Sequence, residues 1–269
     1  MEILLIFKLV FLGVIEGLTE FLPISSTGHL IVFADLINFN NDVATLFEIV
    51  IQLGAILAVV WLYREKILSL IYTIFSDKKS FSFAINLLIA FLPASIIGFF
   101  FHSAIKQYLF NPITVAIALI IGGIIIIYIE NKKIKETTLE AFDINKKSAL
   151  IVGLSQVLSL IPGVSRAGAT IMGGVCSGLS RKASAEFSFF LAIPIMFAAS
   201  FYDLYKNVNI LNLESILIIA VGFVSAFISA LVVIKWFIKF ISSNNFKIFG
   251  WYRIIFGVLL LLFYCFIKG

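Results

Sequence analysis

The chain has 269 residues, of which 61% are hydrophobic and 13% are charged, and its mean hydropathy is +1.11. A soluble domain is nearer half apolar and a quarter charged, so this composition excludes an ordinary soluble protein and predicts an all-α polytopic integral membrane protein. The net charge of +5 is modest, and we attribute it to loop lysines that set orientation, with no nucleic acid as a partner. The two cysteines, Cys176 and Cys265, lie far apart in apolar sequence, which favours neither a disulfide nor a metal site.

The first half of the chain contains one interrupted apolar stretch and three continuous ones. Residues 2–36 are apolar but include Pro23 and a run of hydroxyl side chains. Non-helical backbone is tolerated at membrane depth only where protein buries it or it lines a wet cavity, so a re-entrant, broken-helix hairpin is predicted here. About 20 apolar residues span a bilayer, and three such spans are predicted next, at 43–63, 82–102 and 112–130.

The second half repeats this order. Residues 148–179 are again apolar but broken by proline and glycine, and they are predicted to form the second re-entrant hairpin. Three further spans are predicted at 186–203, 215–237 and 250–268. The expected architecture is therefore about six spanning helices plus two hairpins.

The two hairpins resemble each other in sequence, since LGVIEGLTEFLPISSTGHL (12–30) aligns with VGLSQVLSLIPGVSRAGAT (152–170). We therefore predict a single membrane domain, 1–269, built of a first repeat at 1–135 and a second at 140–269. Each repeat has three spans, an odd number, so the repeats are predicted to have opposite topology. Inverted repeats are common in transporters, where the binding site lies at the interface between them.

The distribution of basic residues predicts the orientation. The positive-inside rule assigns the end with more lysine and arginine to the cytoplasm. The mouth of the first hairpin and both termini then face outward, and the second hairpin enters from the cytoplasm. The basic residues expected on the cytoplasmic side are Arg64, Lys66, Lys78, Lys79, Lys132, Lys133, Lys135, Lys146, Lys147, Lys239 and Lys247, against Lys8, Lys106, Lys206 and Lys268 outside.

Two carboxylates lie close together in the first hairpin, within EGLTEFLPISSTGHL (16–30). Glu16 and Glu20 are four residues apart, so a helix places both on one face. Two neighbouring anions at membrane depth repel each other unless a cation, a shared proton or a metal brought by a substrate lies between them. Mg²⁺ and Ca²⁺ prefer carboxylate oxygens. The alternative is that both are ordinary solvated acids at the membrane surface.

A run of hydroxyl residues follows, Ser25, Ser26 and Thr27, with His29 just beyond. Ser26 and His29 are three residues apart and can form a nucleophile and base. The alternative is that the run caps a helix, and both roles are compatible because a capped helix N-terminus also presents N–H groups to an anion. With a one-residue gap, the repeat alignment places Ser26 over Ser165.

The second hairpin contains an arginine in an apolar setting, within PGVSRAGAT (162–170). The fork of Arg166 matches phosphate or carboxylate oxygens in bidentate fashion. The alternative is that Arg166 forms a structural ion pair with Glu48 or Glu186. Small and hydroxyl neighbours let backbone approach a ligand and add donors: Gly163, Ser165, Gly168 and Thr170.

Acids, a hydroxyl, a histidine and an arginine together favour phosphoryl transfer or hydrolysis, and the membrane setting suggests a lipid phosphate. A transporter or lipid flippase is the main alternative. Against it, Glu20 and His29 have no counterparts in the second half. A second lipid-phosphatase superfamily with a Ser-Arg-x5-His box is disfavoured, because Met172 stands where that box has histidine.

These two motifs, together with FEIVIQLGAILAV (47–59), resemble those of the undecaprenyl-pyrophosphate phosphatase family, also called the bacitracin-resistance family. One departure is Ala167, where the family commonly has serine. The resemblance implies a bacterial plasma-membrane enzyme with an outward-facing site that needs Mg²⁺ or Ca²⁺. It would convert undecaprenyl pyrophosphate to undecaprenyl phosphate, which recycles the lipid carrier of cell-wall synthesis and gives bacitracin resistance.

Carried over to this chain, the resemblance implies that Glu16 and Glu20 hold the metal. Ser26 would attack the phosphorus, His29 would move its proton, and Arg166 would neutralise phosphate charge. The partners expected are a polyprenyl pyrophosphate and membrane lipids, with a homodimer left open. The substrate-binding set expected is Ser25, Thr27, Gly163, Ser165, Gly168 and Thr170.

Overall fold

The computed structural model describes residues 3–39, 42–206 and 213–266, and these residues are almost entirely helical. Within them, strand structure is limited to one isolated bridge between Thr138 and Leu179. The helices are α1 (Ile3–Thr19), α2 (Ser26–Leu36), α3 (Asp42–Leu62), α4 (Arg64–Thr73), α5 (Lys78–Leu109), α6 (Pro112–Asn131), η1 (Ala141–Asp143), α7 (Lys146–Val157), η2 (Leu158–Leu160), α8 (Arg166–Cys176), α9 (Arg181–Lys206), α10 (Leu213–Ile241) and α11 (Lys247–Phe266).

The predicted spans are confirmed. Among the residues that the structure describes, five helices are long and apolar enough to cross a membrane, namely α5, α6, α9, α10 and α11, and α3 makes a sixth when it is joined to α4. The last two residues of the predicted span 250–268 lie outside the described residues, as does Lys268. The protein is thus an all-α, multi-pass membrane protein.

Helix α4 was not predicted. The chain bends by 72° at the break between α3 and α4, where the apolar run of α3 gives way to the charged sequence REK. The side chains of α4 are largely exposed, and its exposed apolar residues are Leu68, Ile71 and Tyr72, with Phe75 just after it.

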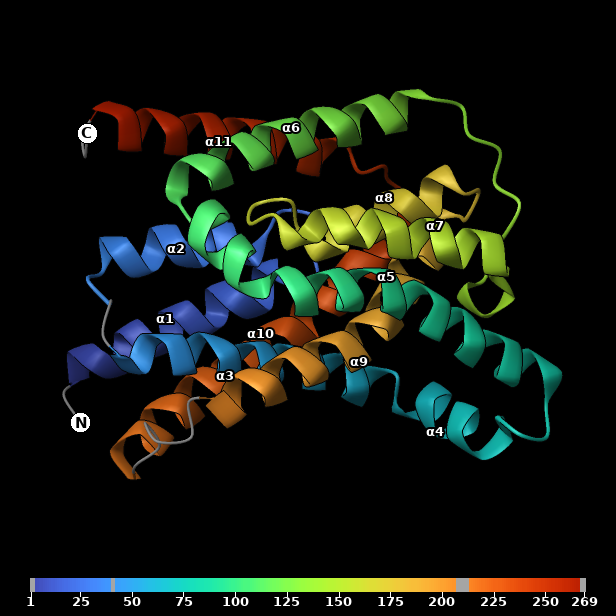
Figure 1. Ribbon diagram of the computed structural model, residues 1–269, viewed down its shortest axis with the longest axis horizontal. Coiled ribbons are helices and arrows are strands. Elements are labelled where there is room, and N and C mark those ends of the chain that lie inside the picture. Colours follow the sequence, from blue (N-terminus) through green and yellow to red (C-terminus); the bar gives the residue numbers. More distant parts are fainter. Residues whose placement is uncertain (1–2, 40–41, 207–212, 267–269) are drawn as a thin grey trace.

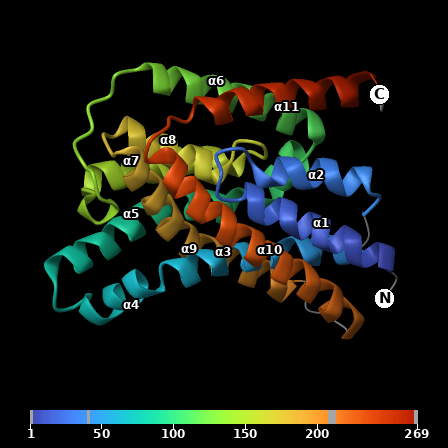
Figure 2. The same cartoon turned by 180° about the vertical axis from the view of Figure 1, so that it is seen from behind.

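Both interrupted stretches form hairpins that enter the helix bundle without crossing it (Figures 1 and 2). Helices α1 and α2 enter from the end of the molecule where α1 begins and α11 ends. Helices α7 and α8 enter from the opposite end, so that the two tips meet near the middle. One apolar cluster contains residues of both tips, including Phe21 and Ile24 of the first and Ala167 of the second.

Equivalent helices of the two halves run in opposite directions, as an inverted repeat requires: α3 against α9, α5 against α10 and α6 against α11 (Figure 1). The tips of the two hairpins also match each other in local backbone geometry. Ser25 and Ser165 each have φ of 72°, and the side-chain oxygen of each accepts a hydrogen bond from the backbone N–H of the glycine three residues on. Ser25 is therefore the counterpart of Ser165. The gapped alignment of Ser26 with Ser165 was wrong by one residue.

The halves interlock at the hairpins. Helix α1 packs on α10 of the second half, and α7 packs on α5 of the first. Small residues allow the close approach: a side chain at Gly17 would collide with Ser229 and the Ala226 carbonyl, and one at Gly153 would collide with backbone at Ala90. Each hairpin is thus held by the opposite half of the chain, which fixes where its tip lies.

Candidate active site

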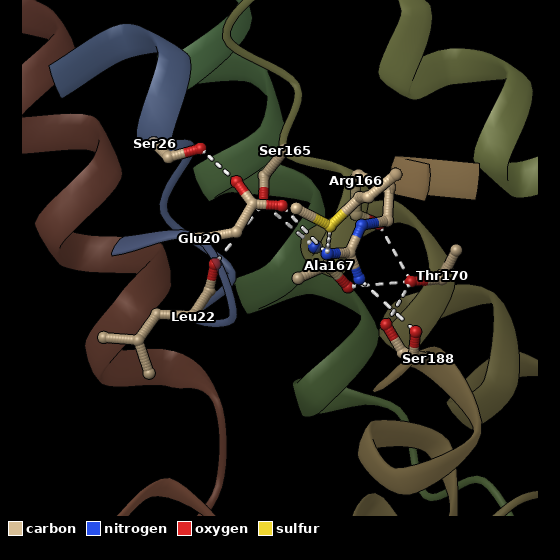
Figure 3. Close-up of polar contacts among 10 residues, drawn as sticks. Glu20, Leu22, Ser26, Ser165, Arg166, Ala167, Thr170 and Ser188 are labelled. Atoms are coloured by element: carbon tan, nitrogen blue, oxygen red, sulfur yellow. Dashed lines mark hydrogen bonds and ion pairs between the residues drawn. The ribbon is translucent and has the colours of Figure 1, made fainter. Parts of the chain in front are cut away.

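The tips of the two hairpins are joined by an ion pair. Nη2 of Arg166 lies 2.9 Å from Oε1 of Glu20, and the two side chains are only 12% and 11% exposed. Figure 3 shows Glu20 reaching from the first hairpin toward the guanidinium of the second. The carboxylate of Glu20 and the guanidinium of Arg166, which belong to separate sequence motifs, therefore lie in one site.

Ser26 completes this centre. Its hydroxyl donates a hydrogen bond of 2.5 Å to Oε2 of Glu20, so one carboxylate contacts both the serine and the arginine (Figure 3). Ser26 begins helix α2 and is buried. A carboxylate that accepts a hydrogen bond from a hydroxyl is placed to take its proton when that hydroxyl attacks.

The guanidinium of Arg166 also contacts neutral partners. Nη1 donates to the carbonyl of Ser188 at 3.3 Å, and the guanidinium lies 5.6 Å from the centre of the Phe21 ring. Glu186, one of the partners considered for a structural pair, instead accepts from Nζ of Lys66 at 3.2 Å. The planar fork of Arg166 therefore lies between the hairpin tips, on the opposite side of the Glu20 carboxylate from Ser26 (Figure 3).

The hydroxyls beside Arg166 hold the second hairpin in place. Thr170 donates to the carbonyl of Arg166 at 2.8 Å and shares a 2.6 Å hydrogen bond with Ser188 of α9. Ser165 accepts from the N–H of Gly168 at 3.0 Å, and its own hydroxyl donates to the carbonyl of Leu22 in the first hairpin at 3.4 Å (Figure 3). The hydroxyls of Ser165 and Thr170 therefore lie at the site, where their hydrogen bonds hold the tip of the second hairpin against the first hairpin and α9.

Both tips end in a capped helix N-terminus, as the capping interpretation required. Ser25 caps α2 by accepting from the N–H of Gly28 at 3.4 Å, and Ser165 caps α8 in the same way. Helix N-termini carry partial positive charge and free N–H groups, which suits them to an anion. Thr27 is half-buried in the first turn of α2.

His29 differs from the prediction. Its Nδ1 donates to the carbonyl of Ser25 at 2.7 Å, and its Nε2 accepts from the Tyr252 hydroxyl at 2.6 Å. The imidazole also stacks on Phe256, with 4.4 Å between ring centres. Both nitrogens are thus occupied, by the N-cap residue of α2 and by a tyrosine of α11, and Ser26 and His29 do not form the pair that the sequence suggested. The carboxylate of Glu20 takes that position.

Glu16 lies one helical turn before Glu20 and is fully buried, and neither of its carboxylate oxygens has a hydrogen-bond partner among the described residues. Buried unpartnered carboxylate oxygens are costly and suit a hard cation. Within the described part of the chain no three acidic, histidine or cysteine side chains form a ready metal cluster. The donor set therefore fits a divalent ion only if phosphate oxygens and water supply further ligands.

Arg253 of α11 was missed by the sequence analysis. It is 1% exposed and donates to the backbone carbonyls of both hairpin tips and of α6. The available signal was an arginine inside a predicted span, since charged residues at membrane depth usually have a specific role. Gly163, with φ of +93°, supplies one of these carbonyls, and a side chain there would collide with the Val115 carbonyl.

A cavity of about 390 Å³ extends from Arg166 along the space between α5, α9 and the end of α7. Its walls are mainly apolar, with Phe91, Phe99 and Ile195 among them, and they also include Tyr202 near the end of α9. The cavity therefore joins the charged centre to the end of the bundle from which the first hairpin enters.

Fold and site together define a class: a multi-pass membrane protein whose interlocked inverted halves enclose a serine, a carboxylate and an arginine. The chain belongs to the bacitracin resistance protein BacA family, whose model matches residues 9–259. It is 54% identical to proteins named undecaprenyl-diphosphatase from Nitrosospira multiformis, with 97% of this chain and 96% of the relative covered, and from Acinetobacter baumannii, with 97% of each covered. It is also 54% identical to undecaprenyl-diphosphatase 3 of Acinetobacter baylyi, over 95% of this chain and 96% of that one.

Proposed function

We propose that this protein hydrolyses undecaprenyl pyrophosphate to undecaprenyl phosphate and inorganic phosphate, and thereby regenerates a lipid carrier of cell-wall synthesis. The observation that carries the proposal is the contact of Glu20 with both Ser26 and Arg166. The names of its relatives and of its family support the substrate and a role in bacitracin resistance.

The reaction starts at Ser26. Its oxygen attacks the terminal phosphorus and its proton passes to Glu20, as the bond from that phosphorus to the bridging oxygen breaks. Undecaprenyl phosphate leaves, and a phosphoserine remains. Water then attacks this phosphorus as its bond to the Ser26 oxygen breaks, and Glu20 returns its proton to that oxygen. Ser26 and the Glu20 carboxylate are thereby regenerated, and inorganic phosphate leaves with the two hydrogens of the water.

Arg166 neutralises charge on the terminal phosphate in both steps. Two of its N–H groups donate hydrogen bonds to two of the phosphate oxygens. Its present partner, Oε1 of Glu20, is an oxygen acceptor of the same kind as a phosphate oxygen. The N-termini of α2 and α8 add backbone N–H groups from either side. Ser165 and Thr170 keep these groups in place through their bonds to Leu22 and Ser188.

Glu16 and Glu20 are the residues that would hold Mg²⁺ or Ca²⁺. The buried oxygens of Glu16, for which the described part of the chain supplies no hydrogen-bond partner, support this assignment. A divalent ion bound there would neutralise charge on the pyrophosphate. Without the ion, the carboxylates would repel the anionic substrate, so activity should depend on the metal.

The cavity beside Arg166 supports a lipid substrate. Its apolar walls suit the first isoprene units of the polyprenyl chain, and its charged inner end suits the pyrophosphate. The end of the bundle it leads toward has few basic residues, whereas the loops at the other end are lysine-rich. We therefore assign the site to the outer side of the bacterial plasma membrane.

The deciding experiment is phosphate release by purified protein in detergent. Undecaprenyl pyrophosphate should yield one phosphate per molecule, and EDTA should abolish the reaction. Hydrolysis needs no gradient or compartment, so an inactive but well-folded preparation supplied with Mg²⁺ or Ca²⁺ would reject the enzyme and favour the transport alternative.

A further inference from the structure

The side chain of Arg253 uses every donor it has. Nε donates to the carbonyl of Leu119 at 3.3 Å, and Nη1 donates to those of Pro23 and Val164 at 3.2 and 2.8 Å. Nη2 donates to the carbonyls of Ala118 and Gly163 at 3.1 and 2.9 Å. A guanidinium has five N–H groups, so none is left to bind a substrate.

These five carbonyls come from three separate parts of the chain. Pro23 lies in the tip of the first hairpin, midway between Glu20 and Ser26. Gly163 and Val164 lie in the tip of the second, just before Arg166. The other two carbonyls belong to α6. A single buried side chain on α11 therefore connects both tips to one another and to a spanning helix.

The backbone carbonyls of the hairpin tips need a hydrogen-bond donor, because no helix supplies one. The tips are the non-helical parts of the hairpins, and their carbonyls lie where water is scarce. Lysine would keep the charge, but its single nitrogen has three N–H groups and no planar fork. Only an arginine can bond all five carbonyls at once.

The fold makes room for this side chain at Gly122 of α6. A methyl group added at Gly122 would overlap the guanidinium of Arg253. Gly122→Ala thus displaces the guanidinium while the arginine itself is retained, which gives a second, independent way to disturb the same contacts.

We propose that Arg253 is a positioning residue for the reaction, which fixes the two hairpin tips relative to each other so that Ser26 and Arg166 act on the same phosphate. This inference rests on the proposed function. Because Arg166 alone can still bind the phosphate, loss of Arg253 affects turnover more than binding. Misplacement of reacting groups by about 1 Å costs about a hundredfold in rate.

The kinetic test compares Arg253→Lys with Arg181→Lys, measured per mole of folded, monodisperse protein. Arg181 pairs with Glu130 through bonds of 2.6 and 3.0 Å at the entrance end of the second hairpin, away from the tips. Arg253→Lys and Gly122→Ala should each lower kcat by about 10- to 100-fold with KM changed less than about threefold. Arg181→Lys should leave kcat unchanged. Unaltered kcat in both Arg253→Lys and Gly122→Ala, or a change in KM alone, would overturn the proposal.

A second readout needs no activity. Hydrogen exchange measured by mass spectrometry should accelerate at residues 20–28 and 160–168 in Arg253→Lys, while α3 and α10 exchange as in the wild type. Arg181→Lys should leave both tips unchanged. Uniform acceleration throughout the chain would show a purely structural role and reject positioning. If the wild type itself does not hydrolyse the substrate, the proposed function fails, and the exchange data alone then decide whether Arg253 orders the tips.

Discussion

Glu20 and Arg166 lie on two different hairpins that enter the protein from opposite ends, yet 2.9 Å separates their charged atoms. Because each residue sits at a tip, the ion pair forms only when both hairpins are fully inserted. The contact therefore assembles the proposed site from residues 146 positions apart in the chain.

Glu20→Gln should lower kcat by about 10²–10⁴-fold, because the amide cannot take the proton of Ser26. The measurement is the rate of phosphate release at saturating lipid. Glu136→Gln is the control, since the ion pair of Glu136 within the described residues is a long, exposed contact with Arg181 and such contacts contribute little. Near-normal turnover by Glu20→Gln would show that another group accepts the proton.

Ser26→Ala should lower kcat by about 10³-fold or more if the serine is the nucleophile. Rapid quenching of the wild type with labelled substrate, followed by mass spectrometry of residues 16–30, should detect an acid-stable phosphoserine. An acid-labile phosphate on His29 would transfer the nucleophilic role to the histidine, and the absence of any adduct would indicate direct attack by water.

Glu16→Gln should separate activity from stability. The change replaces a buried carboxyl group whose oxygens have no hydrogen-bond partner among the described residues, so Tm without metal should stay the same or rise. Its counterpart in the second half, Gln156, is itself a buried glutamine. Ca²⁺ should raise Tm of the wild type and not of Glu16→Gln, and the variant should lose activity. Equal stabilisation of both proteins by Ca²⁺ would place the ion elsewhere.

Arg166→Lys should lower kcat/KM by about 10²–10³-fold, even though the positive charge is retained. A lysine cannot bind two phosphate oxygens through a planar fork. The assay is steady-state hydrolysis over a range of lipid concentrations, with circular dichroism to check folding. Full activity with lysine would mean that a point charge is enough.

Tyr252→Phe tests the position of His29. The variant loses the 2.6 Å hydrogen bond to Nε2 and should be destabilised by about 1 kcal/mol, while kcat and its pH profile stay close to those of the wild type. Tyr264→Phe, which loses a 2.9 Å bond between α11 and Asp35 of α2, is the matched control. A shifted pH profile in Tyr252→Phe alone would restore His29 as the proton shuttle.

Much of the fold could be predicted because its signals are local. Apolar length located the six spans, and proline, glycine and hydroxyl residues located the two hairpins. The grouping of Glu20, Ser26 and Arg166 followed from their motifs. The α3–α4 bend was not predicted. A stretch of apolar residues shows where a span ends, but it does not show in which direction the chain continues.

The parts that were missed depend on distant segments. His29 bonds to Tyr252, 223 residues away, and Arg253 bonds to tips formed 90 and 230 residues earlier. No spacing within a motif encodes such contacts. The one-residue alignment error has another origin, namely the gap that was introduced to align Pro23 with Pro162. The ungapped alignment of 12–30 with 152–170 already pairs Ser25 with Ser165, and the backbone geometry confirms that pairing. Ser26 consequently corresponds to Arg166, so the two tips carry different chemical groups at the same position.

The interlocking of the halves has a consequence for biosynthesis. Helix α1 packs on α10, which is completed only after about 220 more residues (from Thr19 to Ile241) have been made, about 10–45 s at typical synthesis rates. During that interval the first hairpin can pack on α3 and α6 but lacks α10, the helix on which α1 packs most extensively. Its acidic tip is therefore expected to stay at the water interface. Arg253 is supplied by α11, the last of the described helices. We therefore expect the hairpin tips to enter the bundle late, after α11 has been made.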